Sequence, residues 1–215
     1  MRLSYFIIIA IGWSLMSCNP KVKNLTSEDI GVRNFSAKQA ALVNAGAADK
    51  PMRVFKINIK NDSILLRQKS TRVIPDPNDP TLKLMTDRLL TTVRDSMSLG
   101  VGIAAPQVGI LKNIIWVQRF DKPDFPFEVY LNPVIKQYTK KKQPCMEGCL
   151  SIPNKQAETQ NRAYAILLEY DKMDGTYVTE MIEDFTAVIF QHEIDHLHGI
   201  MFTDHLEQEI EEAGK

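Results

Sequence analysis

The sequence has few cysteines and histidines, and neither positive nor negative charges are in excess. Its 215 residues include 26 Lys and Arg and 26 Asp and Glu, so the formal net charge is zero, and no long basic block is present. This balance argues against nucleic acid as a partner. The chain also has only three cysteines and four histidines. Three cysteines are an odd and sparse set, which argues against a disulfide scaffold.

An apolar run of the ~20 residues that a membrane-spanning helix needs is also lacking. Residues 3–16 form a shorter run behind Arg2, and the run ends at Leu15-Met16-Ser17-Cys18. This arrangement resembles a bacterial lipoprotein signal, in which the cysteine is lipidated and becomes the new N-terminus. We therefore expect residues 1–17 to be a signal peptide. Lipidated Cys18 would then anchor the protein to a bacterial membrane on the outside of the cytoplasm, in the periplasm or at the outer membrane. An uncleaved membrane anchor is the alternative.

The length allows one well-filled core with extensions. Residues 18–50 are polar and rich in Ala, Asn and Ser, without sustained periodicity apart from a weak stretch over 36–43. They are expected to form a flexible tether. The remaining residues, 51–215, are expected to form one catalytic domain.

Hydrophobic periodicity predicts both helices and strands in this domain. The predicted strands are residues 52–59, 114–117, 128–131, 165–170 and 177–179. A helix is predicted to follow the Pro/Asp cluster at 75–80, with a single apolar stripe of Leu82, Met85, Leu89, Val93 and Met97. A second helix is predicted over 185–198. This order has no regular strand–helix–strand repeat, which favours an α+β fold with antiparallel sheet.

The strongest local signal is His192-Glu193-Ile194-Asp195-His196. Histidines four residues apart lie on one helical face, where both imidazoles can reach one metal ion beside the carboxylate of Glu193. Because two of the four histidines fall at this spacing inside an apolar segment, we expect them to bind a metal.

Two imidazoles are too few, and the third ligand decides the class of enzyme. Metzincin proteases need a histidine at position 202, where this chain has Phe202. Downstream glutamates are weaker candidates: Glu207, Glu209, Glu211 and Glu212. Cys149 is a further candidate, because Gly148 allows close backbone approach and a thiolate is a strong ligand for a borderline-soft divalent metal.

Three motifs together are similar to those of the peptide deformylase family. They are GVGIAAPQ at 100–107, EGCLS at 147–151 and QHEIDHLHG at 191–199, and they occur in the family's order. Weaker similarity runs from about Ile64 to Asp204. The resemblance implies antiparallel sheets packed around a central HExxH helix, and hydrolysis of N-formyl-methionyl peptides to formate and a free amino terminus. Ile103, often Leu in the family, and the polar Gln156 are small departures that bear on substrate preference.

The resemblance also implies roles for individual residues. Cys149, His192 and His196 would hold one divalent metal, Fe²⁺ or Zn²⁺, and leave one coordination position for water. Glu193 would act as general base and then as general acid. Gln107 and the backbone N–H of Leu150 would donate to the developing oxyanion.

The implied peptide lies extended beside Val101 and Gly102 and close to Gly148, with an apolar pocket for a Met-like side chain. Val188 and Ile189 would form walls of this pocket, or plain core. Asp195 is expected either to orient a ligand or to pair structurally, and Arg162 to anchor a strand start. Cys145 is expected to be structural, and His198 and His205 to be surface residues rather than metal ligands.

Other functions remain open at this stage. They are a zinc metallopeptidase, a deacylase of another N-acyl peptide, and a lipoprotein that keeps only a structural metal centre. The presence of both Glu193 and Gln107 argues against the last, because a structural metal site needs neither.

Overall fold

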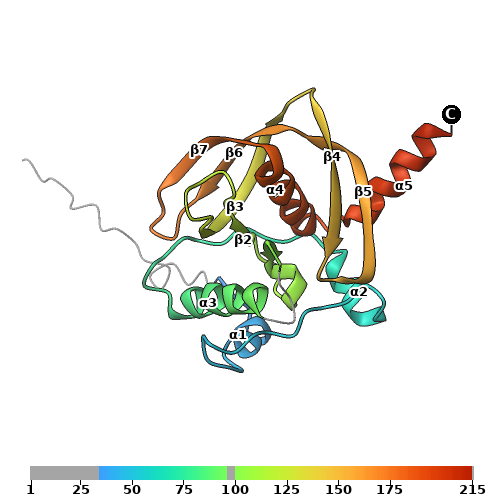
Figure 1. Cartoon of the computed structure of the whole chain (residues 1–215). Coiled ribbons are helices and arrows are strands. Elements are labelled where there is room, and N and C mark those ends of the chain that lie inside the picture. The colour runs from blue at the N-terminus through green and yellow to red at the C-terminus, as the bar shows by residue number, and fades with distance from the viewer. Residues whose placement is uncertain (1–33, 96–99, 215) are drawn as a thin grey trace, which may run out of the picture.

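The computed structural model describes residues 34–95 and 100–214 (Figure 1). The elements, in chain order, are α1 (Ala37–Val43), α2 (Lys60–Leu66), α3 (Pro80–Arg94), β1 (Gly102–Ala104), a 3-10 helix (Ala105–Val108), β2 (Ile114–Gln118), β3 (Phe127–Tyr138), β4 (Lys142–Cys149), β5 (Ile152–Ala163), β6 (Ala165–Asp171), β7 (Tyr177–Glu183), α4 (Asp184–Leu197) and α5 (Phe202–Ala213).

The strands form two antiparallel sheets. Five strands pair in the order β1-β2-β3-β6-β7, and β4 pairs with β5 in a separate hairpin. The hairpin is inserted in the chain between β3 and β6, and the turn at its far end lies beside the 3-10 helix that follows β1, where Gln107 Nε2 donates to Ser151 Oγ (3.3 Å). The α+β class with antiparallel sheet is therefore confirmed.

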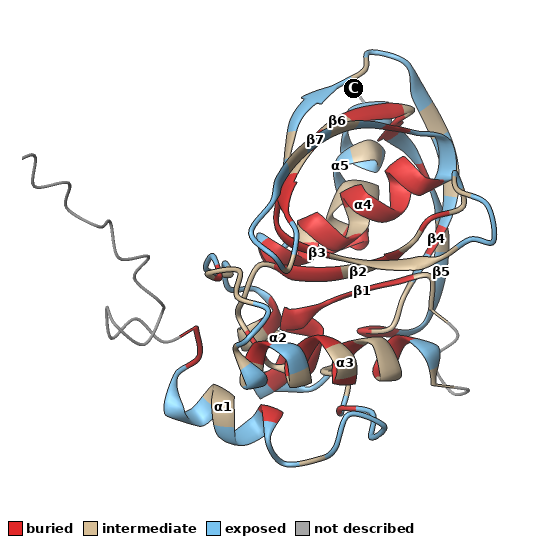
Figure 2. Ribbon diagram, turned by 90° about the vertical axis from the view of Figure 1, so that its left-hand side faces the viewer, coloured by how far each residue is buried: buried red, intermediate tan, exposed pale blue. Residues whose placement is uncertain are grey.

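The two long helices α3 and α4 cover opposite faces of the five-stranded sheet. Successive residues of a strand point to opposite faces. Accordingly, Ile114 belongs to the buried cluster around α3, and Ile115 belongs to the cluster around α4. Figure 2 shows α4 enclosed by strands, with α3 on the other side of β1 and β2. This packing buries most of α4, including the polar side chains of Gln191, Glu193 and His196.

Both predicted helices and four of the five predicted strands are confirmed. Asp79 caps α3, since its side chain accepts hydrogen bonds from the backbone N–H groups of Thr81 and Leu82. The predicted stripe is buried from Leu82 to Val93, and Met97 lies outside the described residues. The helix predicted over 185–198 is α4, displaced by one residue.

The strand predicted over residues 52–59 is wrong. Among the described residues this segment pairs with no strand, and residues 57–59 form a turn and a bend. Its backbone N–H groups bond elsewhere: Phe55 N–H donates to the carbonyl of Gln107 (2.7 Å) and Ile57 N–H to the carbonyl of Ser151 (2.9 Å). Its apolar side chains, Met52, Phe55 and Ile57, pack against the core although the segment joins no sheet, which explains the misleading pattern. The segment then enters α2, a short helix that was not predicted.

The flexible tether predicted up to residue 50 is wrong for residues 34–50. Phe35 and Val43 are buried in the core around α3. The buried Arg88 of α3 donates to the carbonyls of Leu42, Val43 and Lys50. The folded domain therefore begins at or before Asn34, whose amide group bonds to the backbone of Ile74.

The predicted signal peptide, the lipidated Cys18 and the start of the tether lie outside the described residues. Across residues 34–95 and 100–214, no helix combines the length and apolar character required to cross a membrane.

Candidate active site

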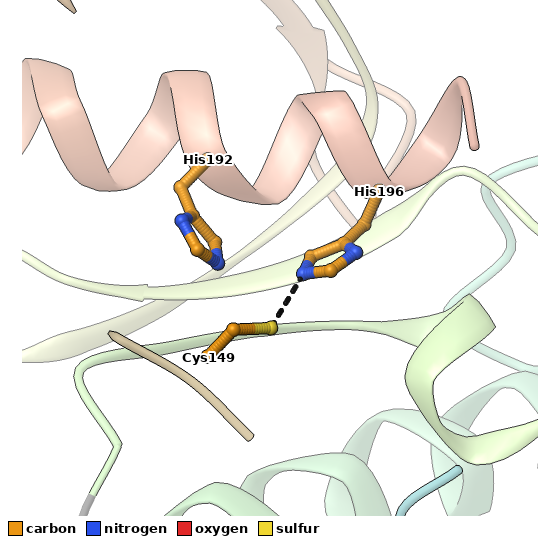
Figure 3. Close-up of side chains that lie close together, drawn as sticks. All are labelled: Cys149, His192 and His196. Atoms are coloured by element: carbon orange, nitrogen blue, oxygen red, sulfur yellow. Dashed lines mark hydrogen bonds between the residues drawn. The ribbon is translucent and has the colours of Figure 1, made fainter. Parts of the chain in front are cut away.

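Helix α4 brings both histidines of the motif to one side. The helix packs through its apolar residues against the five-stranded sheet, and Gly199 follows its end with a φ of +76°. A Cβ at Gly199 would lie 2.4 Å from the carbonyl oxygen of Arg67, so glycine is required there. His192 and His196 project from the helix toward Cys149, at the end of β4 (Figure 3).

These three side chains form a potential metal site. The ligand atoms of Cys149, His192 and His196 all lie within 4.8 Å of one another, and Cys149 Sγ is 3.2 Å from His196 Nε2. One thiolate and two imidazoles suit a borderline-soft divalent metal. Among residues 34–95 and 100–214, no other metal-ligating side chain joins the group. Three protein ligands leave a position for water or substrate, as in catalytic sites.

Glu147 fixes the orientation of His192. Its Oε2 lies 2.7 Å from His192 Nδ1, so Nε2 is the nitrogen left for a metal. Burial alone would raise the pKa of Glu147, but hydrogen bonds from His192 and Arg162 outweigh burial and hold the pKa well below its usual value. Glu147 is thus a carboxylate that supports a metal ligand.

Glu193 is buried beside the ligands and, unlike Glu147, forms no ion pair with any residue that the structure describes. Burial raises the pKa of Glu193 to about 7, although the neighbouring His192 and His196 act in the opposite direction. Within the described part of the chain, its Oε2 has no hydrogen-bond partner. A carboxylate with a pKa near neutrality is suited to accept and return a proton.

Gln107 reaches the same place from the 3-10 helix that follows β1. Its Oε1 accepts a hydrogen bond from Ala104 N–H (2.8 Å), which leaves Nε2 directed at Cys149 Sγ (3.6 Å) and Ser151 Oγ (3.3 Å). The donor of Gln107 is therefore oriented toward the metal site before any substrate binds.

A cleft of about 740 Å³ opens onto these groups. It is lined by ten of the eleven predicted site residues: Val101, Gly102, Gln107, Gly148, Cys149, Leu150, Val188, Ile189, His192 and Glu193. The remaining one, His196, is buried behind the cleft in contact with Cys149. The structure thus brings all eleven together.

A family comparison agrees with this site. Residues 54–212 match the model of the family described as polypeptide deformylase. The chain belongs to this family. As a peptide deformylase, it is a metal-binding hydrolase.

Individual peptide deformylases show the extent of the similarity. That of Desulforudis audaxviator is 37% identical over 153 residues, 71% of this chain and 94% of its own. That of Microchaete diplosiphon is 35% identical over 163 residues, 73% of this chain and 86% of its own. The class I type b enzyme from Acinetobacter baumannii, solved with Met-Ala-Ser bound, is 30% identical with a TM-score of 0.64, over 73% of this chain and 99% of its own.

Arg162 joins Glu147 to Asp195 behind the deformylase metal site. The buried guanidinium donates to Glu147 through Nε (2.8 Å) and Nη2 (2.9 Å), and to Asp195 through Nη1 (2.7 Å). Arg162 therefore does more than anchor a strand start, and Asp195 pairs structurally. His198 is exposed, as predicted. His205 is not among the side chains grouped around the metal site in the described residues, but it is half-buried, 2.8 Å from Asp195, and so is less exposed than predicted.

Several cleft residues were not predicted. Met146, Phe185, Asn154 and Lys155 line the cleft, and so does Cys145, to which only a structural role was assigned. Phe185 lies seven residues before His192 on α4, so helical spacing could have placed it on the same face. Asn154 and Lys155, near the start of β5, carry no comparable signal.

Gly102→Ala is expected to lower kcat on the order of 100-fold, because it displaces Glu193. A Cβ at Gly102 would lie 2.6 Å from Glu193 Oε1 and 2.9 Å from Ile189 Cγ2. Steady-state kinetics measures the fall in kcat, and a metal determination on the same sample measures the metal content. Metal content should be unchanged, since neither Gly102 nor Glu193 is a metal ligand. A variant with wild-type kcat would mean that Glu193 has room to move without loss of function.

Proposed function

We propose that this protein hydrolyses N-formyl-methionyl peptides to formate and a peptide with a free amino terminus. The observation that carries the proposal is the meeting of Cys149, His192 and His196 with Glu193 and Gln107 in one cleft. The Acinetobacter baumannii relative has been solved with Met-Ala-Ser, a peptide of the kind that such a reaction releases.

Cys149, His192 and His196 would hold one Fe²⁺ or Zn²⁺ ion. When bound, such an ion supplies Lewis acidity, which polarises a carbonyl oxygen and lowers the pKa of water. Glu193 accepts the proton of the water that attacks the formyl carbon, and returns it to the peptide nitrogen as the C–N bond breaks. Gln107 Nε2 and the backbone N–H of Leu150 donate to the formyl oxygen as it gains negative charge.

The peptide would bind as an added strand beside Val101 and Gly102. β1 is at the edge of the five-stranded sheet, where only one side is paired with another strand. An extended peptide can pair with such an edge through its main chain. Val188 and Ile189 line the cleft from α4 and would contact the methionine side chain.

The direct test uses the full-length chain with formyl-Met-Ala-Ser, under anaerobic Fe²⁺ and separately under Zn²⁺, with formate release as the measurement. Release that requires the metal would support the proposal, and the two rates would indicate which metal serves better. A metal-loaded protein that releases no formate would contradict it. Release of another acyl group, or cleavage of an internal peptide bond, would then favour the deacylase or the metallopeptidase.

Gln107→Ala is expected to lower kcat by about 100- to 1,000-fold, because it removes one donor to the developing oxyanion. Gln156→Ala is a matched control, since Gln156 lines the same cleft from β5 beside Gly148. The control should alter KM more than kcat. Equal effects of the two variants on kcat would argue against a specific role of Gln107.

We also propose that Cys18 is lipidated and holds the protein on a bacterial membrane outside the cytoplasm. The support is the apolar run 3–16 with Arg2 before it and Leu15-Met16-Ser17-Cys18 at its end. Metabolic labelling with a radioactive fatty acid should label the wild type but not Cys18→Ala. Unlabelled wild-type protein in the cytosolic fraction would contradict the proposal.

A further inference from the structure

The turn after β4 contacts the thiolate of Cys149 through a single peptide group. Ser151 N–H donates to Cys149 Sγ at 3.4 Å. The carbonyl of Leu150, which belongs to the same peptide group, accepts a hydrogen bond from Lys56 Nζ. A lysine ammonium and the metal-ligating sulfur therefore lie at opposite ends of one peptide group.

Lys56 is held in this position by its own backbone. Its N–H donates to Asp62 Oδ2 (3.0 Å), and the next residue, Ile57, donates to the carbonyl of Ser151 (2.9 Å). In the part of the chain that the structure describes, the Lys56 ammonium forms no ion pair. No contacting carboxylate offsets its charge, so the field of the ammonium acts on the Leu150 carbonyl.

We propose that Lys56 is a positioning residue that tunes Cys149 as a metal ligand through the Leu150–Ser151 peptide group. A charge-assisted hydrogen bond to the carbonyl polarises the peptide group and makes its N–H a stronger donor. The stronger N–H···S bond withdraws electron density from the sulfur and holds the turn in place. Groups that contact metal ligands in this way adjust the affinity of the site.

The same contact fixes the turn that carries the backbone N–H of Leu150, one of the two proposed donors to the formyl oxygen. Lys56 would therefore affect both the metal and the oxyanion donors, although it lines neither. This inference rests on the metal site of the proposed function and not on the identity of the substrate.

The test compares Co²⁺-loaded Lys56→Met with the wild type. The thiolate-to-Co²⁺ charge-transfer band reports the electron density on Cys149 sulfur directly. In Lys56→Met we expect the band to move to longer wavelength, because the sulfur regains electron density. We also expect Co²⁺ to be lost to a chelator on the order of tenfold faster, because the turn that positions Cys149 is no longer held by Lys56 and this effect outweighs the gain in donor strength. Lys56→Arg, which keeps a cationic donor, should restore both. Lys60→Met is the matched control, because Lys60 is an exposed lysine four residues away.

Each outcome supports or overturns the inference. A band and a release rate in Lys56→Met equal to those of Lys60→Met would overturn it. So would a loss of thermal stability that is as large without metal as with it, because Lys56 would then serve the fold alone. If Lys56→Met does not fold, Lys56→Gln replaces it under the same criteria. A wild type that shows no thiolate band would instead overturn the metal site of the proposed function.

Discussion

Glu193→Gln is expected to lower kcat for formate release by about 100- to 10,000-fold, because a carboxamide cannot accept a proton from the attacking water. The protein should keep its metal, since the ligands are Cys149, His192 and His196. Kinetics with formyl-Met-Ala-Ser and a metal determination on the same sample check both parts. The carboxylate is buried, and its Oε2 has no hydrogen-bond partner within the described residues.

Because the Glu193 carboxylate is buried, the Glu193→Gln variant should unfold at a temperature no lower than that of the wild type. A neutral group costs less to bury than a charged one. Full activity in the metal-loaded variant would remove Glu193 from the mechanism. A variant without metal would show instead that Glu193 supports the site, and the kinetic result would then carry no information about proton transfer.

Arg162→Met is expected to lower the free energy of unfolding by about 3 to 5 kcal/mol, because it removes the buried guanidinium that offsets the charges of Glu147 and Asp195. Glu147 loses two hydrogen bonds and Asp195 loses one. Because Glu147 orients His192, the variant should also lose metal more readily than the wild type. Chemical denaturation of metal-free protein measures the first effect, and competition with a chelator measures the second.

Arg72→Met provides the matched control. Arg72 also pairs with a carboxylate, Asp171, at 2.9 Å, but its side chain is 65% exposed. The exposed pair should contribute less than about 1 kcal/mol. If the two variants lost equal stability, burial of Arg162 would not be the cause of its effect.

The sequence predicted the parts of the site that follow from spacing along one helix or from a contiguous motif. His192, Glu193 and His196 needed only the helical repeat of α4. Cys149 was one of several open candidates for the third ligand, and its neighbours in EGCLS resolved the choice only through family resemblance. The long helix α3 could be predicted equally well, because its apolar stripe and its cap at Asp79 are local features of the sequence.

Contacts between distant segments could not be predicted. Lys56 meets Leu150 across 94 positions, and Arg162 meets Asp195 across 33. No pattern in the sequence marks either pair. Residues 34–50 were also missed, although Ser36 and Gln39 form a capping box that marks the start of α1. Helix α1 has only seven residues, too few to give a sustained period.

Because Cys149 lies at the end of β4, the length of the β4–β5 hairpin determines where this metal ligand is placed. The chain leaves the five-stranded sheet after Tyr138 and rejoins it at Ala165, so the number of residues in β4 and β5 sets how far the turn lies from these two points. Each strand residue adds about 3.4 Å. Removing two residues from each strand would keep every side chain on its original face but retract the turn by about 7 Å. That displacement exceeds the 4.8 Å within which the three ligand atoms lie. The spacing between metal ligands is therefore encoded in the length of the hairpin as well as in the identity of the residue at its tip.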